Sequence, residues 1–327
     1  MPYRILSIDG GGIRGIIPAT VLAYLEADAG RPVHELFDLI VGTSTGGIIT
    51  LALAGRSDGT APLTAARAAD LYAEQGSRIF SRSAIHRART LGGMLGNRYP
   101  ATGLEQVLHE TLGQTRLADL SSDVVIPAYE TEMRVPWFFR SRRARDDAAY
   151  DFAIRDVARA TAAAPTYFPA ARITAGDGED WTLIDGGTFA NNPTMCAIAD
   201  ALADHGAGDL QVLSLGTGEL TRSLSYDRIR SWGLLGWARP LLDVVFDGVS
   251  QTTDHHARQL SGAAGDDAEH HRWQVRLSVG SDDLDDATAD NVATLRRLAE
   301  DLVTEHADAL AKLARRLVPD QPEDPTG

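Results

Sequence analysis

The chain has 327 residues, of which 44% are hydrophobic and 23% charged, so it can bury a large core as one α/β domain or two smaller ones. Its formal net charge of −14 argues against a nucleic-acid-binding protein, because such proteins usually carry a basic face. The single cysteine, Cys196, excludes an internal disulfide and the usual zinc-finger spacings, and no apolar run approaches the length that crosses a membrane.

The first fifty residues alternate between strand-like and helix-like patterns, as at the start of a parallel α/β sheet. An apolar strand over 4–9 leads into a glycine loop and a helix, and a second apolar run, 37–41, leads into a sharp turn and a helix over 47–54. The first strand begins almost at once, which leaves no room for a signal peptide. We therefore expect a cytoplasmic protein.

Further along the chain these patterns continue without an internal repeat or an evident linker. Helices are predicted over 63–80, 103–112, 154–164 and 289–317, and strands over 124–129, 135–140, 181–184, 210–215 and 272–278. Residues 228–260 form a long apolar helical region that is broken by Gly233, Gly236 and Pro240. We predict a single domain over 1–318, followed by an acidic, proline-rich tail, 319–327, that does not fold alone.

The loop after the first strand has two chemical interpretations. Gly10, Gly12 and Gly15 match the dinucleotide-binding pattern G-x-G-x-x-G, but the second strand ends in Val41-Gly42-Thr43, without the acidic residue of such sites. The alternative is an oxyanion hole, in which successive backbone N–H groups converge on the charge of an acyl-transfer intermediate. Arg14 would then hold the loop or add positive potential. A plain tight turn is the third interpretation.

The turn Gly42-Thr43-Ser44-Thr45-Gly46 lies between the second strand and a helix. A strand that turns sharply into a helix crowds its neighbours, which favours glycine two residues either side of the turning residue. The same turn exposes the serine hydroxyl at the positive end of the helix. This context predicts a nucleophile at Ser44, and it favours the oxyanion-hole interpretation of the preceding loop.

A serine nucleophile needs a base, for which a carboxylate and several histidines are candidates. Asp185-Gly186-Gly187 follows a predicted strand, and ligand sites in open parallel sheets gather beyond the carboxyl ends of strands; Asp185 could instead cap a turn. A triad of Ser44 and Asp185 with His205, His255 or His256 would suit an α/β-hydrolase. In those enzymes, however, the serine turn follows several strands, not the second. We therefore predict that the histidines are surface or structural groups.

Taken together, these residues resemble the patatin-like phospholipase family. The resemblance rests on three ordered motifs, with supporting blocks at 160–169 and 214–218: Asp9-Gly10-Gly11-Gly12-Ile13-Arg14-Gly15, Gly42-Thr43-Ser44-Thr45-Gly46-Gly47, and Asp185-Gly186-Gly187 continuing into Asn191-Asn192-Pro193. It implies a three-layer α/β/α sandwich with a mostly parallel central sheet.

The resemblance also implies the site. Ser44 would be the nucleophile and Asp185 the base of a dyad without histidine, supported by the glycines of both turns, Gly42, Gly46, Gly186 and Gly187. The oxyanion hole would be formed by the N–H groups of Gly10, Gly11 and Gly12, with Arg14 nearby. No metal and no cofactor is implied. Because an ordinary aspartate has a pKa of about 3.9, burial would have to raise the pKa of Asp185 to make it a useful base.

The implied activity is that of a serine acyl hydrolase that cleaves fatty acyl esters of phospholipids or related lipids through an acyl-serine intermediate. Two alternatives stay open: an acyltransferase or thioesterase that uses the same intermediate, and a catalytically weak lipid-binding or signalling module. The oligomeric state is not predicted.

Two segments bear on contact with a membrane surface. Five arginines lie in a stretch without an acidic residue, which favours either contact with anionic lipids or a solvated, internally paired face: Arg78, Arg82, Arg87, Arg89 and Arg98. The second segment, 231–242, contains Trp232 and Trp237. We predict that it packs as a helix over the sheet; the alternative is an interfacial loop.

Overall fold

The computed structural model describes residues 2–90, 96–206, 209–237, 240–263 and 269–318, so the predicted tail lies outside the described residues. In the described part, one central sheet has the order β5-β6-β3-β2-β1-β7-β8, and β4 pairs with β3 off this path. β1, β2, β3, β7 and β8 are parallel. β4 and β6 pair antiparallel with β3, and β5 pairs antiparallel with β6. The strands are β1 (Tyr3–Ile8), β2 (Leu39–Gly42), β3 (Asp123–Glu130), β4 (Val135–Arg140), β5 (Ala171–Thr174), β6 (Asp180–Asp185), β7 (Leu210–Leu215) and β8 (Glu269–Trp273).

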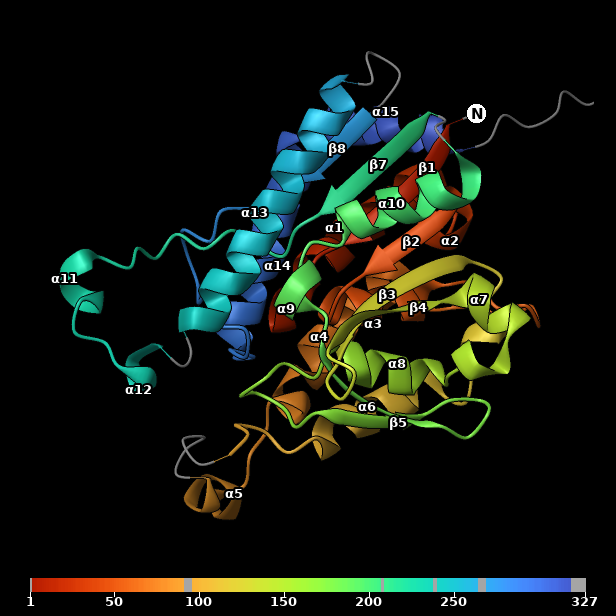
Figure 1. Cartoon of the computed structure of the whole chain (residues 1–327). Coiled ribbons are helices and arrows are strands. Elements are labelled where there is room, and N and C mark those ends of the chain that lie inside the picture. The colour runs from red at the N-terminus through yellow and green to blue at the C-terminus, as the bar shows by residue number, and fades with distance from the viewer. Residues whose placement is uncertain (1, 91–95, 207–208, 238–239, 264–268, 319–327) are drawn as a thin grey trace, which may run out of the picture.

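Helices cover both faces of this sheet, which confirms the predicted three-layer α/β/α sandwich (Figure 1). One face carries α10 (Thr194–His205) and α13 (Pro240–Ala263), and the other carries α1 (Ile16–Ala29), α14 (Ala289–Glu305) and α15 (Ala307–Leu317). In β1, Leu6 and Ile8 pack in the core beside α1, whereas Ile5 packs with the apolar side chains of α10. The inner strands are thus apolar on both faces, as expected for parallel strands between two helical layers.

A second apolar core lies beyond β3, where α3, α6 and α8 meet. It contains Leu51 of α3, Leu104 of α6 and Val157 of α8. These helices and α4 are α3 (Thr45–Leu53), α4 (Ala65–Ile79), α6 (Thr102–Leu112) and α8 (Ile154–Thr161). The shorter helices are α2 (Val33–Leu36), α5 (Ala84–Arg89), α7 (Ser141–Asp146), α9 (Gly187–Ala190), α11 (Tyr226–Ile229) and α12 (Leu234–Trp237). Within the described ranges, every helix is too short or too polar to cross a bilayer.

Two predicted elements have the wrong bounds. The strand predicted over 272–278 is β8, Glu269–Trp273, because its partner β7 ends at Leu215, opposite Trp273. The helix predicted over 289–317 is two helices, α14 and α15, separated at His306 with φ −110° and ψ 20°. Both helices pack against α1, and the break lets the apolar face follow that contact.

The prediction that 231–242 packs over the sheet is also wrong. α11 and α12 project from the body of the molecule (Figure 1), and 93% of the Leu234 surface is exposed. The rings of Trp232 and Trp237 pack edge to face on each other, with centroids 5.4 Å apart. The two tryptophans therefore bury part of their surface against each other, not against the sheet.

The stretch of five arginines is at least partly paired. Arg78 forms an ion pair of 2.7 Å with Glu110, and Arg98 forms one of 2.6 Å with the buried Asp285. The Arg82 guanidinium lies over the Tyr99 ring, 5.8 Å from its centroid. The side chains of Arg87 and Arg89 lie outside the described part of the structure. These contacts favour the paired face over an open anion-binding surface.

Candidate active site

β2 and β6 approach each other end to end on one edge of β3, and this junction positions the candidate site. β4 pairs with β3 from Val125 to Glu130, so it occupies one edge of that stretch. β2 places Val41 opposite Val125, and β6 places Asp185 opposite Ala128, so both use the other edge. β2 runs parallel to β3 and β6 antiparallel. The ends of the two strands therefore face each other, one followed by Ser44 and the other ending at Asp185.

Ser44 adopts a backbone conformation that is uncommon for a residue with a side chain. Its φ is 55° and its ψ is −119°, between the end of β2 and the start of α3. The Ser44 N–H donates to Thr161 Oγ1 at 2.9 Å, and the Thr161 hydroxyl donates to the Pro127 carbonyl at 2.6 Å. The Ser44 carbonyl accepts from Ile48 at 3.0 Å, in the first turn of α3. These bonds fix the turn that exposes the hydroxyl.

The glycines around this turn are required by close backbone approaches. A Cβ on Gly42 would lie 2.2 Å from the Gly46 carbonyl oxygen, and one on Gly46 would lie 2.2 Å from the Ile8 carbonyl oxygen. Gly186 is equally crowded, since its Cβ would lie 2.3 Å from the Pro127 carbonyl oxygen. The crowding expected from the sequence at Gly42 and Gly46 thus has identified partners, and Gly186 is crowded as well.

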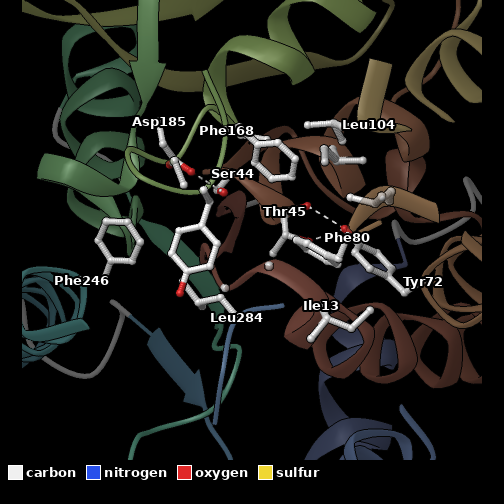
Figure 2. A pocket seen from close by; sticks show the side chains of 17 residues that line it. Ile13, Ser44, Thr45, Tyr72, Phe80, Leu104, Phe168, Asp185, Phe246 and Leu284 are labelled. Carbon is white, nitrogen blue, oxygen red and sulfur yellow. Dashed lines mark hydrogen bonds between the residues drawn. The ribbon is translucent and has the colours of Figure 1, made fainter. Parts of the chain in front are cut away.

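Ser44 and Asp185 are directly hydrogen-bonded. Ser44 Oγ donates to Asp185 Oδ2 at 2.7 Å (Figure 2). The Gly187 N–H donates to Asp185 Oδ1, also at 2.7 Å. Asp185 is 1% exposed, and this burial raises its pKa from 3.8 to about 7, against the lowering effect of the two hydrogen bonds. A carboxylate with a pKa near neutrality suits general base catalysis at physiological pH.

The glycine loop offers two of its three predicted N–H groups to the site. The Gly10 N–H already donates to the Asn191 carbonyl at 2.9 Å, so it is not free to hold an oxyanion. The N–H groups of Gly11 and Gly12 have no acceptor among the residues that the structure describes, and both residues line the same cavity as Ser44. Gly12 has φ 59°, and a Cβ there would lie 2.1 Å from the Leu284 carbonyl oxygen.

Arg14 lies on the far side of this loop. Its side chain is buried, and Nε donates to the Gly11 carbonyl at 3.2 Å. The guanidinium lines a recess with Asp243 and Asp247, outside the residues that surround Ser44. Of the two roles predicted for Arg14, the position fits holding the loop, not adding a donor beside Ser44.

The strand before the loop is fixed by an ion pair that the sequence did not reveal. Asp9 Oδ2 and Arg272 Nη2 are 2.5 Å apart, and both side chains are almost fully buried. Arg272 also donates to Ser214 Oγ at 2.9 Å, which ties β8, β7 and the end of β1 together. Asp9 belongs to the first motif, but no local pattern points to Arg272 as its partner. Thr161, which binds the Ser44 N–H, was likewise not identified as a site residue.

Ser44 and Asp185 open onto an apolar cavity, called here the Ser44 cavity (Figure 2). The residues that line it come from the N-terminal, central and C-terminal parts of the chain. Their apolar side chains suit a fatty acyl group. They include Ile48, Phe80, Leu104, Phe168, Phe246 and Leu284.

None of the three histidines considered for a triad lines the Ser44 cavity. The His205 ring lies 4.3 Å from the ring of Tyr3, at the start of β1 and thus at the opposite end of that strand from the loop. His255 and His256 are exposed on α13. The described residues contain no group of three or more His, Cys, Asp or Glu side chains placed to hold a metal ion.

A family model described as patatin-like phospholipase matches residues 6–198, which include Ser44, Asp185 and the glycine loop. The chain is 32% identical to Patatin-like protein 2 from Arabidopsis thaliana, over 91% of this chain and 82% of that protein. It is 35% identical to a cGAMP-activated phospholipase from Pseudomonas aeruginosa, over 80% of this chain and 76% of that protein. It is 30% identical to Probable inactive patatin-3-Kuras 1 from Solanum tuberosum, over 91% and 86%.

Among solved structures, VipD from Legionella pneumophila aligns with a TM-score of 0.45 at 10% identity, over 94% of this chain and 67% of that chain. That likeness is too weak to support an argument. The family model and the extensive sequence matches to patatin-like proteins are sufficient to assign the family. The protein belongs to the patatin-like phospholipase family.

Proposed function

We propose that the protein is a serine acyl hydrolase that releases fatty acyl chains from phospholipids or related acyl esters, with Ser44 as nucleophile and Asp185 as base. The observation that carries this proposal is the 2.7 Å hydrogen bond from Ser44 Oγ to Asp185 Oδ2 at the wall of an apolar cavity. Belonging to the family does not by itself guarantee activity, since one relative is named probable inactive. The intact pair of side chains argues against a purely lipid-binding module.

In the first half of the proposed reaction, Asp185 Oδ2 takes the proton of Ser44 Oγ as the oxygen attacks the ester carbonyl carbon. The carbonyl oxygen becomes an oxyanion that accepts hydrogen bonds from the N–H groups of Gly11 and Gly12, each worth about 3–4 kcal/mol in measured oxyanion holes. When the intermediate collapses, the ester bond breaks and Asp185 returns the proton to the leaving alcohol. The acyl chain is now bound to Ser44.

In the second half, Asp185 takes a proton from water, which attacks the acyl-serine carbonyl carbon. Collapse of this second intermediate breaks the bond to Ser44 Oγ, which regains a proton from Asp185. The fatty acid leaves along the Ser44 cavity. An acyltransferase or thioesterase would use the same acyl-serine, and differs in the acceptor or the leaving group. Measuring how acyl groups partition between water and an added alcohol distinguishes a hydrolase from a transferase.

Labelling with a lipid-like fluorophosphonate, followed by peptide mapping, tests the assignment of Ser44. We expect a single modified site at Ser44 that is lost in Ser44→Ala. In Asp185→Asn, ester hydrolysis should fall by about 10²–10⁴-fold, the usual contribution of a general base. His205→Ala is the matched control and should retain activity. A near-normal Asp185→Asn enzyme together with an inactive His205→Ala enzyme would refute the dyad and assign the role of base to His205.

We also propose that the protein contacts membranes through α11 and α12. Tyr226 and Leu234 are 76% and 93% exposed there, next to a tryptophan pair, and α13, which follows, carries Phe246 into the Ser44 cavity. Apolar and aromatic side chains on a projecting segment suit the interface of a bilayer. Sedimentation with phospholipid vesicles tests this proposal. Leu234→Glu should reduce binding to vesicles, while hydrolysis of a soluble ester stays unchanged.

A further inference from the structure

A polar cavity lies beside the Ser44 cavity, between the start of α13 and the segment 220–236. Its volume is about 460 Å³, and Tyr167 lines both cavities. Along α13, Phe246 lines the Ser44 cavity and Asp247 lines the polar cavity. In the same way, Leu284 lines the Ser44 cavity and its neighbour Asp283 lines the polar cavity. The polar cavity therefore adjoins the candidate reaction centre, and Tyr167 borders both.

The polar cavity carries charges of both signs on different walls. Arg222 and Arg228 come from the projecting segment, whereas Asp243 and Asp247 come from α13. Arg222 contacts three carboxylates at long distances: 3.4 Å to Asp282, 3.9 Å to Asp283 and 4.0 Å to Asp243 of α13. Asp247 has no ion-pair partner within 4.0 Å in the described part of the chain, and burial raises its pKa to about 6. In the described residues the charge of Asp247 is therefore not neutralised by an ion pair, whereas Arg222 shares its charge with three carboxylates.

A recess that shares Leu220, Asp243 and Asp247 extends this cavity toward the glycine loop. Arg14, only 5% exposed, lines it, and no carboxylate lies within 4.0 Å of its guanidinium among the described residues. Asn191, 7% exposed, also lines the recess, and its Oδ1 has no hydrogen-bond partner there. The Arg14 guanidinium donates to the carbonyls of Gly11 and Asp282, so of these two residues only Asn191 has a polar atom without a partner among the described residues. Because buried polar groups are normally paired, the Asn191 Oδ1 favours a polar ligand in this recess.

We propose that the polar cavity binds the head group of the lipid substrate, and that this head group carries both a phosphate and an ammonium group. The inference rests on the proposed function, since it places the ester at Ser44 and the head group past Tyr167, which lines both cavities. The phosphate faces Arg222 and Arg228, and the ammonium faces Asp243 and Asp247. A head group with negative charge alone would meet the aspartates of α13 without compensation.

The ammonium part is tested with mixed micelles of phosphatidylethanolamine or phosphatidic acid that have identical acyl chains. The quantity compared is the ratio of kcat/KM for the two lipids within each variant, so that a general loss of activity cancels. Asp247→Asn should lower this ratio at least about fivefold, the equivalent of one modest ion pair. Asp301→Asn, an exposed aspartate on α14, is the matched control and should leave the ratio unchanged.

The phosphate part is tested in the same way with phosphatidylethanolamine and diacylglycerol. Arg222→Gln should lower the kcat/KM for phosphatidylethanolamine relative to that for diacylglycerol, again at least about fivefold. Arg297→Gln, exposed on α14, should leave this ratio unchanged. Ratios unchanged in both Asp247→Asn and Arg222→Gln overturn the proposal.

Calorimetry with soluble glycerophosphoethanolamine and the Ser44→Ala protein separates this inference from the proposed function. Binding that is weakened by Asp247→Asn, without any lipid hydrolysis by the wild type, would sustain the cavity assignment and refute the hydrolase. Lipid hydrolysis without such binding, and without a change in the ratios, would sustain the hydrolase and refute the cavity assignment. Binding of glycerophosphoethanolamine with unchanged lipid ratios would assign the cavity to a free phosphate ester and overturn the head-group assignment.

Discussion

Ser44 Oγ and Asp185 Oδ2 lie 2.7 Å apart, at the point where β2 and β6 meet on one edge of β3. The second carboxylate oxygen, Oδ1, is held by the Gly187 N–H. One oxygen of Asp185 is thus fixed by the backbone, and the other is left to exchange a proton with the serine. The catalytic proposal depends on the protonation state of this one carboxyl group.

The pH dependence of hydrolysis should follow Asp185. Its pKa is raised from 3.8 to about 7, and only the deprotonated carboxylate accepts the proton of Ser44. We expect kcat/KM for a soluble ester to rise tenfold per pH unit well below pH 7, and to level off above it. Ser44→Ala provides the background rate at each pH. A midpoint near pH 4 would show that burial does not raise the pKa of this carboxyl group.

The same shift predicts the stability of Asp185→Asn. The folded-state pKa lies above the unfolded value, so the native state is penalised as pH rises from about 4 to about 7, as Asp185 ionises more readily in the unfolded chain. The neutral amide lacks this penalty. At pH 8 the variant should have a larger free energy of unfolding than the wild type, by at most about 4 kcal/mol, and the difference should shrink toward pH 4.

Urea unfolding of both proteins at pH 8 and pH 4.5 measures this difference. Asp301→Asn, exposed on α14, controls for the loss of a negative charge and should show no comparable pH-dependent gain. A variant that is less stable than the wild type at pH 8 would contradict the predicted sign.

Thr161 should act as a positioning residue for the serine turn. Thr161→Val keeps the shape but leaves the Ser44 N–H and the Pro127 carbonyl without their partner, at a cost of about 1–3 kcal/mol. We expect kcat to fall while KM changes little, because Thr161 does not line the Ser44 cavity. Thr161→Ser should restore kcat. A stable Thr161→Val enzyme with normal kcat would show that the turn holds its conformation without this hydroxyl.

Gly46 should not tolerate a methyl group. In Gly46→Ala the Cβ would lie 2.2 Å from the Ile8 carbonyl oxygen, so β1 and α3 must separate, at a cost of about 3 kcal/mol. Gly248→Ala is the matched control, since in the described structure no atom outside the neighbouring backbone of α13 lies within 4 Å of its Cβ position. That substitution should stabilise the helix by about 0.5–1 kcal/mol. Thermal unfolding of both variants measures the contrast, and equal effects would contradict the crowding at Gly46.

The sequence was sufficient where the chemistry is local. The turn at Ser44, the glycine loop and the strand end at Asp185 each follow from a few neighbouring residues, and the resemblance ordered them into one family. The alternation of strand and helix patterns predicted a parallel α/β sheet, and the family resemblance implied the three-layer sandwich. These predictions needed no knowledge of which strands pair.

The sequence did not predict the contacts between segments that lie far apart in the chain. The antiparallel approach of β6 to β3 depends on register between segments far apart in the chain, and no local signal encodes it. The partner of Asp9 is Arg272, and the partner of the Ser44 N–H is Thr161; both contacts exist only in the folded chain. The Gly10 N–H was predicted to be an oxyanion donor, but in the folded chain it donates to the Asn191 carbonyl. In 231–242, composition did not reveal that the tryptophans pack on each other.

Because Ser44 follows β2 and Asp185 ends β6, ester hydrolysis also reports whether these two strands are correctly aligned on β3. A slip of β6 by one residue along β3 would carry Asp185 about 3.3 Å away and turn its side chain to the opposite face of the sheet. A misaligned molecule could retain most of its helices and its compactness and still be inactive. During refolding, the return of ester hydrolysis should therefore lag behind the return of helical structure, and it should mark the moment when the two halves of the sheet settle on their native pairing.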